Sequence, residues 1–287
     1  MSGEDNKGIS GNAPSKDISR EIENFYSRKW TRHTGFWRDF YKEHSVLKLD
    51  VLVKRHKLMD ELSKGCSSVL DIGCGVGDLL RDVGHRGLRV GIDMSDTNLR
   101  ISRKNLECEK DVFFLMADGC LLPFADKTFD AVYFADVIEH IPDYSDAIRE
   151  IHRVLKPGSR CICVTPNGGA IRFFALLDRI VYGFYFTIKR GNRPNPLREV
   201  YYEQFLPRGV LRNAFKDAGF TVERHTKDIF YPGTESTGFI PHILIKLHRT
   251  SRPLFRMSVF LLRRFATVME PLRFLNFKQV LVAKKPD

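Results

Sequence analysis

The sequence contains no apolar run of the roughly 18 residues that a membrane-spanning helix requires. Residues 1–17 are rich in Gly, Ser, Asn and charged residues, and they lack the apolar core of a signal peptide. We therefore expect residues 1–17 to form a disordered tail. The expected location is cytoplasmic, with at most a peripheral association at the inner face of a membrane.

The chain has six cysteines but no C-x-x-C pair. The cysteines are scattered through segments typical of strands and helices, as expected for small buried hydrophobes of a reduced protein. Cys161 and Cys163 are predicted to share one face of a strand, but no His or Cys cluster accompanies them. We therefore expect no metal site.

The glycine-rich segment Val69–Leu80, VLDIGCGVGDLL, does not follow the dinucleotide-binding pattern G-x-G-x-x-G. It predicts a buried strand, a tight turn and a helix. Asp71 is followed by Gly73, Gly75 and Gly77, which leave three positions without a side chain where a nucleotide-like ligand would approach. The alternative is the tight strand-to-helix turn of an α/β domain that binds nothing there.

The pattern D-x-G-x-G-x-G after a hydrophobic strand resembles motif I of the class I S-adenosylmethionine-dependent methyltransferases. The pair Glu139-His140 resembles that of the small-molecule type of ubiquinone and menaquinone biosynthesis. Later segments match this family in order and at suitable spacing: Leu88–Ser95, Val112–Phe124, Phe129–Asp143 and Ile151–Asn167. In the last segment, Lys156–Gly158 is expected to end a helix before a strand from Cys161 to Thr165.

The resemblance implies S-adenosyl-L-methionine as the cofactor and assigns residues to it. Asp93, about 20 residues after the glycine turn, is expected to accept from the ribose hydroxyls. Asp118 would receive the adenine amino group, Met94 would pack on the adenine, and Leu121 or Cys120 would flank it. The predicted cofactor-binding residues are Asp71, Gly73, Cys74, Gly75, Gly77, Asp93, Met94, Asp118, Gly119 and Ala135.

The same resemblance implies an α/β, Rossmann-like fold with a seven-stranded sheet of order 3-2-1-4-5-7-6, in which the last strand is antiparallel and helices cover both faces. The ligand is expected beyond the carboxyl ends of the parallel strands, where the order reverses. We predict an N-terminal helical cap over residues 18–64 and the methyltransferase domain over 65–287. Two connections, 168–206 and 231–276, are much longer than is usual in α/β units and are predicted to form lids on the cofactor face.

These two insertions carry most of the excess positive charge. The formal net charge of the chain is +11, and Gly168–Leu206 and Tyr231–Lys278 contribute +3 and +6 of it. Segment 249–271 predicts a basic amphipathic helix, which could lie on an anionic membrane. The alternative is a helix that packs on its own domain or on a partner. One side would carry Arg249, Arg252, Arg256 and Arg263, and the other Leu254, Leu261, Leu262, Phe265, Val268 and Met269.

Nucleic acid is a less favoured partner, because ADVIEH follows the fourth strand in place of the N/D-P-P-Y/F motif of base-amino methyltransferases. His140 in this segment is the candidate general base, since imidazole titrates near neutral pH. The alternative is a structural histidine beside the adenosine. Asp130 is expected to be structural, and His242 lies in the second insertion.

Three functions follow from these observations. The favoured one is methyl transfer from S-adenosylmethionine to a hydrophobic or lipid-like acceptor at a membrane surface, such as a quinone precursor or polyprenyl compound. The second is a soluble O- or N-methyltransferase of a small metabolite, with the insertions closing its pocket. The third is a cofactor-binding protein that no longer catalyses and acts as an interaction module.

Overall fold

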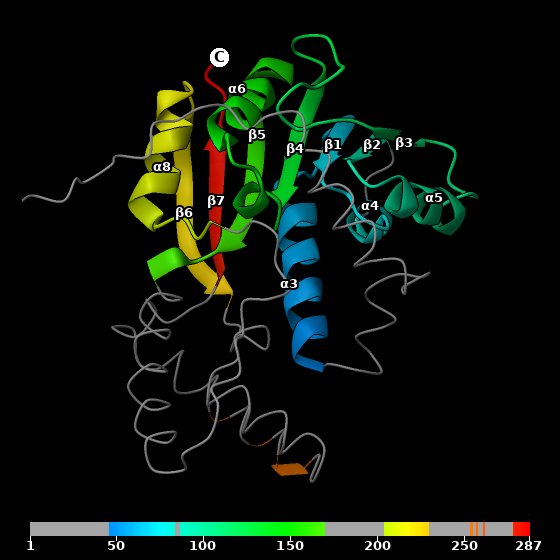
Figure 1. Ribbon diagram of the computed structural model, residues 1–287, viewed down its shortest axis with the longest axis horizontal. Helices are drawn as coiled ribbons and strands as arrows, with labels where there is room; N and C mark the ends of the chain where they lie inside the picture. Colours follow the sequence, from blue (N-terminus) through cyan, green and yellow to red (C-terminus); the bar gives the residue numbers. More distant parts are fainter. Residues whose placement is uncertain are drawn as a thin grey trace, which may run out of the picture.

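The computed structural model describes residues 46–83, 87–169, 204–229 and 278–287, together with residues 253, 254, 257 and 261. Seven strands form one sheet of order β3-β2-β1-β4-β5-β7-β6 (Figure 1). Neighbouring strands are parallel except for β7, which is antiparallel to β5 and β6. The predicted fold class is confirmed. The strands are β1 Ser68–Ile72, β2 Leu88–Asp93, β3 Val112–Met116, β4 Phe129–Ala135, β5 Leu155–Pro166, β6 Thr221–Ile229 and β7 Lys278–Lys284.

Helices cover both faces of this sheet. One core cluster joins α6 and α8 to Leu70, Ile72, Val132 and Phe134. The other joins α3 and α4 to Val69, Ala131 and Tyr133. Alternate residues of β1 and β4 thus point into opposite cores, so these central strands are apolar on both sides. The helices are α3 Val46–Leu62, α4 Asp78–Asp82, α5 Asp96–Asn105, the short 3-10 helix η1 Ile138–His140, α6 Tyr144–Val154 and α8 Arg208–Asp217.

The turn at Lys156–Gly158 differs from the prediction. Helix α6 ends at Val154, and residues 156–158 lie inside β5. The β4–β5 pairing passes from Leu155 opposite Phe129 to Arg160 opposite Ala131, so the strand bulges here, with a positive φ of 76° at Gly158. Since Pro157 has no N–H to donate to a helix, the chain becomes extended before it rather than after it.

Helix α3 belongs to the predicted N-terminal cap, and three polar contacts fasten it to the rest of the domain. Arg55 donates to Asp136 at 2.6 Å, His56 Nδ1 lies 2.9 Å from Asp82, and Ser63, just after the helix, shares a 2.5 Å hydrogen bond with the buried Tyr133 hydroxyl. Burial lowers the pKa of His56 to about 4 although Asp82 opposes the shift, so this histidine is neutral at physiological pH.

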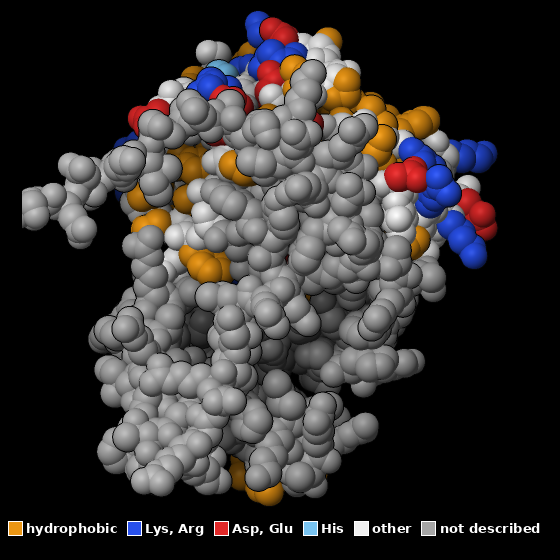
Figure 2. Space-filling view, in the orientation of Figure 1, with side chains coloured by type: hydrophobic (Ala, Val, Ile, Leu, Met, Phe, Trp, Pro, Cys, Tyr) orange, Lys and Arg blue, Asp and Glu red, His pale blue; other side chains and the backbone are white. Residues whose placement is uncertain are grey.

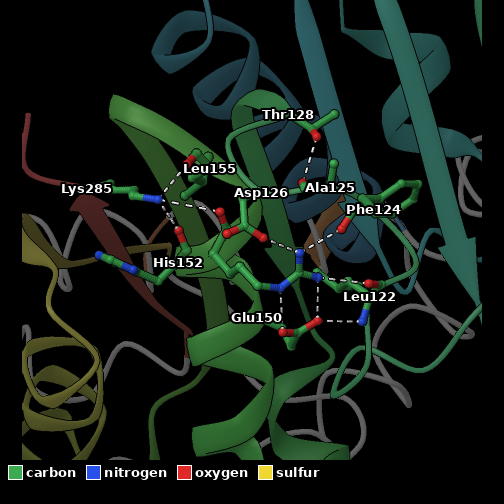
Figure 3. Close-up of polar contacts among 10 residues, drawn as sticks. Leu122, Phe124, Ala125, Asp126, Thr128, Glu150, His152, Leu155 and Lys285 are labelled. Atoms are coloured by element: carbon green, nitrogen blue, oxygen red, sulfur yellow. Dashed lines mark hydrogen bonds and ion pairs between the residues drawn. The ribbon is translucent and has the colours of Figure 1, made fainter.

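The loop between β3 and β4, which carries Asp118, is held by Arg153 of α6 (Figure 3). The Arg153 guanidinium donates to the carbonyls of Leu122 and Phe124 at 2.9 and 2.7 Å. It also pairs with Asp126 and Glu150, both at 2.8 Å. These hydrogen bonds hold the carboxyl pKa of Glu150 below its usual range. Arg153 therefore holds in place the loop that carries Asp118, on the predicted adenine side of the site.

The predicted lids lie mostly outside the described residues, as do residues 1–45 and His242. In the second insertion, the described residues 253, 254, 257 and 261 are helical, and Figure 1 places them beyond the edge at which β4 and β5 end. None of the described helices is long and apolar enough to span a bilayer.

Candidate cofactor and active site

The glycine turn follows β1 at the edge where the parallel strands end. Its three glycines, residues 73, 75 and 77, all have positive φ values, of 70°, 54° and 86°. A Cβ at Gly73 would stand 2.3 Å from the side chain of Val137, so the turn approaches the segment after β4 too closely for any larger residue. A Cβ at Gly75 would meet nothing within 4 Å. This side of the turn is open to a ligand.

Asp93 lies at the end of β2 and reaches the same turn. Its carboxylate accepts from the Gly75 N–H at 2.9 Å, from the Ser95 N–H at 2.8 Å and from Asn98 Nδ2 at 3.4 Å. Burial raises the carboxyl pKa of Asp93, and these hydrogen bonds oppose the shift. The N–H groups of Gly73 and Cys74 donate to the carbonyl of Ile92, so the ends of β1 and β2 form one unit. The assignment of Asp93 to the ribose stays a prediction.

The predicted adenine side is formed by the segment after β3. Asp118 is exposed and accepts from the Cys120 N–H at 2.8 Å, while Leu121 is 78% exposed. A Cβ at the buried Gly119 would lie 3.2 Å from Ile72, which places this segment against the end of β1. Met94 and Ala135 are half-buried at the ends of β2 and β4. The structure thus brings the predicted residues to one edge of the sheet.

Asp136, directly after β4, organises the centre of this edge and was missed as a functional residue in the sequence. Its backbone is left-handed, with a φ of 57°. Arg55 donates to its Oδ2 at 2.6 Å, and Lys278, the first residue of β7, donates to Oδ1. Burial would raise its pKa, but Lys278 and Arg55 hold it below its usual range. Asp136 is therefore an ionised carboxylate shared by two cations.

Glu139, in η1, is a second carboxyl group that the sequence did not single out except as the neighbour of His140. It is only 2% exposed, and its Oε2 accepts from Thr165 Oγ1 at 2.9 Å. Burial, and after it the charge of Asp136, raises the pKa of Glu139 to about 7. Asp71 behaves similarly, because burial raises its pKa to about 8 against the opposing charge of Arg55.

His140 is half-buried beside these carboxyl groups, and its N–H donates to the carbonyl of Val137 at 2.8 Å. Its charge contributes to the lowered pKa of Asp136, so the imidazole faces the same cluster. The general-base role stays a prediction. Asp130, in contrast, accepts from the N–H groups of Ser67 and Ser68 and from Lys156, which is a structural role at the start of β4.

The first insertion begins and ends beside His140. Gly168 donates to the carbonyl of Leu206 at 3.3 Å, so the two described stems lie side by side. The Gln204 N–H donates to the carbonyl of Glu139 at 2.8 Å, and its side chain donates to the carbonyl of Ile141 at 2.5 Å. The buried Gln279 of β7 donates to Leu206 at 2.8 Å. No sequence pattern indicated these contacts.

These residues fit the cofactor that the resemblance implies. The open side of Gly75, the carboxylate of Asp93 and the approach of the turn to Val137 leave a cradle bounded by backbone rather than side chains. The buried Nε of Arg55 has no hydrogen-bond partner, so it remains available to an anionic group. Asp71, Gly73, Asp93 and Asp118 would hold such a ligand.

The chain is similar to known methyltransferases in sequence and in fold. The family model of a methyltransferase domain matches residues 70–163. A demethylmenaquinone methyltransferase of Lactococcus lactis is 28% identical over 198 residues, covering 65% of this chain and 76% of that protein. One from Staphylococcus aureus strain JH9 is 29% identical over 219 residues, covering 72% and 86%. The structure of an S-adenosylmethionine-dependent methyltransferase from Mesorhizobium loti matches with a TM-score of 0.54 at 15% identity, covering 83% of this chain and 100% of that one.

We predict that Asp93→Ala weakens the binding of S-adenosylhomocysteine about tenfold or more, because two charge-assisted hydrogen bonds to ribose are lost. Isothermal titration calorimetry measures the effect. Asp96→Ala is the matched control, since Asp96 lies three residues away and forms an ion pair with the exposed Arg100. Equal affinities for Asp93→Ala and the wild type would contradict the ribose assignment.

A second prediction concerns pH. In the folded protein the pKa of Glu139 is raised to about 7, whereas the ordinary pKa of a glutamate is 4.5. The folded state therefore binds more protons between these values, and the free energy of unfolding falls as the pH rises through this window. In Glu139→Gln the fall should be smaller, by up to about 3 kcal/mol.

Denaturant unfolding at about pH 5 and pH 7 measures this difference. Glu61→Gln, at an exposed position of α3, is the control. Its free energy of unfolding should change with pH as that of the wild type does. The raised pKa of Asp71 acts equally in all three proteins and cancels in the comparison. If the free energy of unfolding changes equally between the two pH values in Glu139→Gln and in the wild type, Glu139 ionises normally in the folded protein.

Proposed function

Because this chain carries a class I, S-adenosylmethionine-dependent methyltransferase domain, we propose that it methylates a hydrophobic acceptor of the quinone-precursor class. The support from relatives is the demethylmenaquinone methyltransferases, which align with most of the chain. The structural observation that carries the proposal is the position of both insertion stems. Gln204 is bonded to η1 beside His140, and Lys278 is bonded to Asp136. Both insertions thus return to the sheet beside η1 and Asp136, and we expect the acceptor to meet the methyl group there.

The reaction is an in-line displacement, in which the acceptor atom bonds to the methyl carbon as the carbon–sulfur bond breaks and its electrons remain on sulfur. S-adenosylmethionine supplies that activated methyl group when bound. A reduced quinone precursor offers an aromatic ring carbon whose proton must leave after the methyl group is attached. His140 would take this proton on its imidazole, because it lies in η1 directly after β4 and because the ordinary pKa of an imidazole is near neutral.

We also propose that the second insertion attaches to an anionic membrane surface, where such an acceptor resides. Leu254, Met257 and Leu261 are helical and are 47%, 52% and 57% exposed. Their spacing of three and four residues puts them on one side of a helix. Figure 2 shows hydrophobic side chains at the lower end of the molecule, where Figure 1 places the described residues of the second insertion. The arginines of segment 249–271 would contact lipid phosphates.

The acceptor is tested directly. With S-adenosylmethionine, the purified chain should convert demethylmenaquinol to a product one methylene heavier, measured by mass spectrometry, and should act more weakly on the same quinol without its prenyl tail. Asp93→Ala is the inactive control. Binding of S-adenosylhomocysteine without turnover of either quinol would overturn the acceptor class and leave the cofactor assignment intact.

The membrane proposal predicts flotation with vesicles that contain phosphatidylglycerol, and weaker flotation with pure phosphatidylcholine. Replacing Leu254, Met257 and Leu261 together by Gln should release the protein from both, because the inserted apolar area is lost while helix propensity is kept. Val210→Gln, at an exposed apolar position of α8, is the control. Equal flotation of the triple variant and the wild type would overturn the proposal.

A further inference from the structure

The edge that receives the cofactor holds many carboxyl groups and few cations. Asp71, Asp93, Asp118, Asp136 and Glu139 lie at or just after the ends of β1 to β4. The cofactor brings one more carboxylate, on its methionine portion, and a carboxylate entering such an edge needs a cation. Among the described residues, two Arg or Lys side chains are bonded within this group of acids. They are Arg55 and Lys278.

Arg55 has the chemistry and the spare hydrogen-bonding capacity for this contact. Its Nη1 donates to Asp136 at 2.6 Å, and its Nη2 lies 3.3 Å from His56 Nε2. Its Nε is buried and has no hydrogen-bond partner. The guanidinium also lowers the pKa of Asp71 in the glycine-turn motif, which places its charge toward the turn. A buried N–H without a partner is costly, and a ligand carboxylate would satisfy it.

We propose that Arg55 binds the carboxylate of the cofactor's methionine portion and that Asp136 holds its guanidinium in place. A planar guanidinium offers parallel N–H donors that match a carboxylate, whereas the Lys278 ammonium is a point charge already bonded to Asp136. Arg55 thereby selects ligands that carry the amino-acid portion. This inference concerns the donor only and does not depend on the acceptor.

Arg55 can be replaced without removing every attachment of α3. His56 still bonds Asp82, Ser63 still bonds Tyr133, and Met59 is fully buried in the core beneath the helix. Arg55→Met keeps the length of the side chain and removes the guanidinium. Arg55→Lys keeps the charge and removes the planar donor pair. Lys57→Ala is the matched control, because Lys57 is an exposed cation on the same helix.

Calorimetric titration with two ligands tests the assignment. S-adenosylhomocysteine carries the amino-acid portion, and 5′-methylthioadenosine keeps the nucleoside and the sulfur without it. Arg55→Met should weaken S-adenosylhomocysteine binding about tenfold or more and leave 5′-methylthioadenosine within twofold, and Arg55→Lys should restore part of the difference. Lys57→Ala should bind both ligands as the wild type does.

Equal weakening of the two ligands in Arg55→Met would overturn the proposal, since it would show a structural role for Arg55. Unchanged binding of both ligands would overturn it as well. A selective loss in Lys278→Met with none in Arg55→Met would assign the carboxylate to Lys278 instead. Thermal unfolding without ligand is recorded for each variant, and if Arg55→Met does not fold, the same ligand comparison on Arg55→Lys decides.

Discussion

The ion pairs at Asp136 connect parts of the chain that no local structure would bring together. Arg55 comes from the helix that precedes the sheet, Asp136 from the end of the central strand β4, and Lys278 from the start of the last strand. Asp136 is half-buried, and the charges of Lys278 and Arg55 hold its pKa below its usual range. The position of α3 against the sheet, the left-handed turn after β4 and the stem of the second insertion therefore depend on the same contact.

The surrounding carboxyl groups follow from the same electrostatic constraint. Several negative charges close together are unfavourable where the strand ends are shielded from water. Burial raises the pKa values of Asp71 and Glu139 to about 8 and 7. The charges of Lys278 and Arg55 keep Asp136 ionised. Protonation of Glu139 also lets its buried side chain lie next to Asp136 without repulsion.

The arrangement separates donor recognition from acceptor recognition. The donor side is made of short segments at strand ends, held by the Arg153 anchor and by hydrogen bonds between the glycine turn and β2. The acceptor side begins at stems that are bonded to η1 and to Asp136. The hydrogen bonds of Gln204 to Glu139 and Ile141 connect the stem of the first insertion to the residues on both sides of His140.

Much of the architecture could be predicted from the sequence, because it is encoded locally. Hydrophobic strand patterns and the D-x-G-x-G-x-G turn carried the resemblance, and the resemblance implied the sheet order. That order implied which strand ends meet, so Asp93 and Asp118 could be predicted at one edge of the sheet with the glycine turn. The boundary of α6 was wrong by two residues, since a proline and a glycine can end a helix or form a bulge in a strand. Local pattern alone does not separate those outcomes.

The tertiary structure alone decided which charges meet. Arg55 and Lys278 lie 81 and 142 residues from Asp136, and among the chain's many basic residues neither carries a local pattern that marks it. The raised pKa of Glu139 has the same origin, because burial depends on packing from β5 and from the stem of the first insertion. The sequence by itself determined the fold and the identity of the donor, because their signals are periodic and short-range. The electrostatic partners inside that site required the fold, because attraction between charges depends on distance in space and not on separation along the chain.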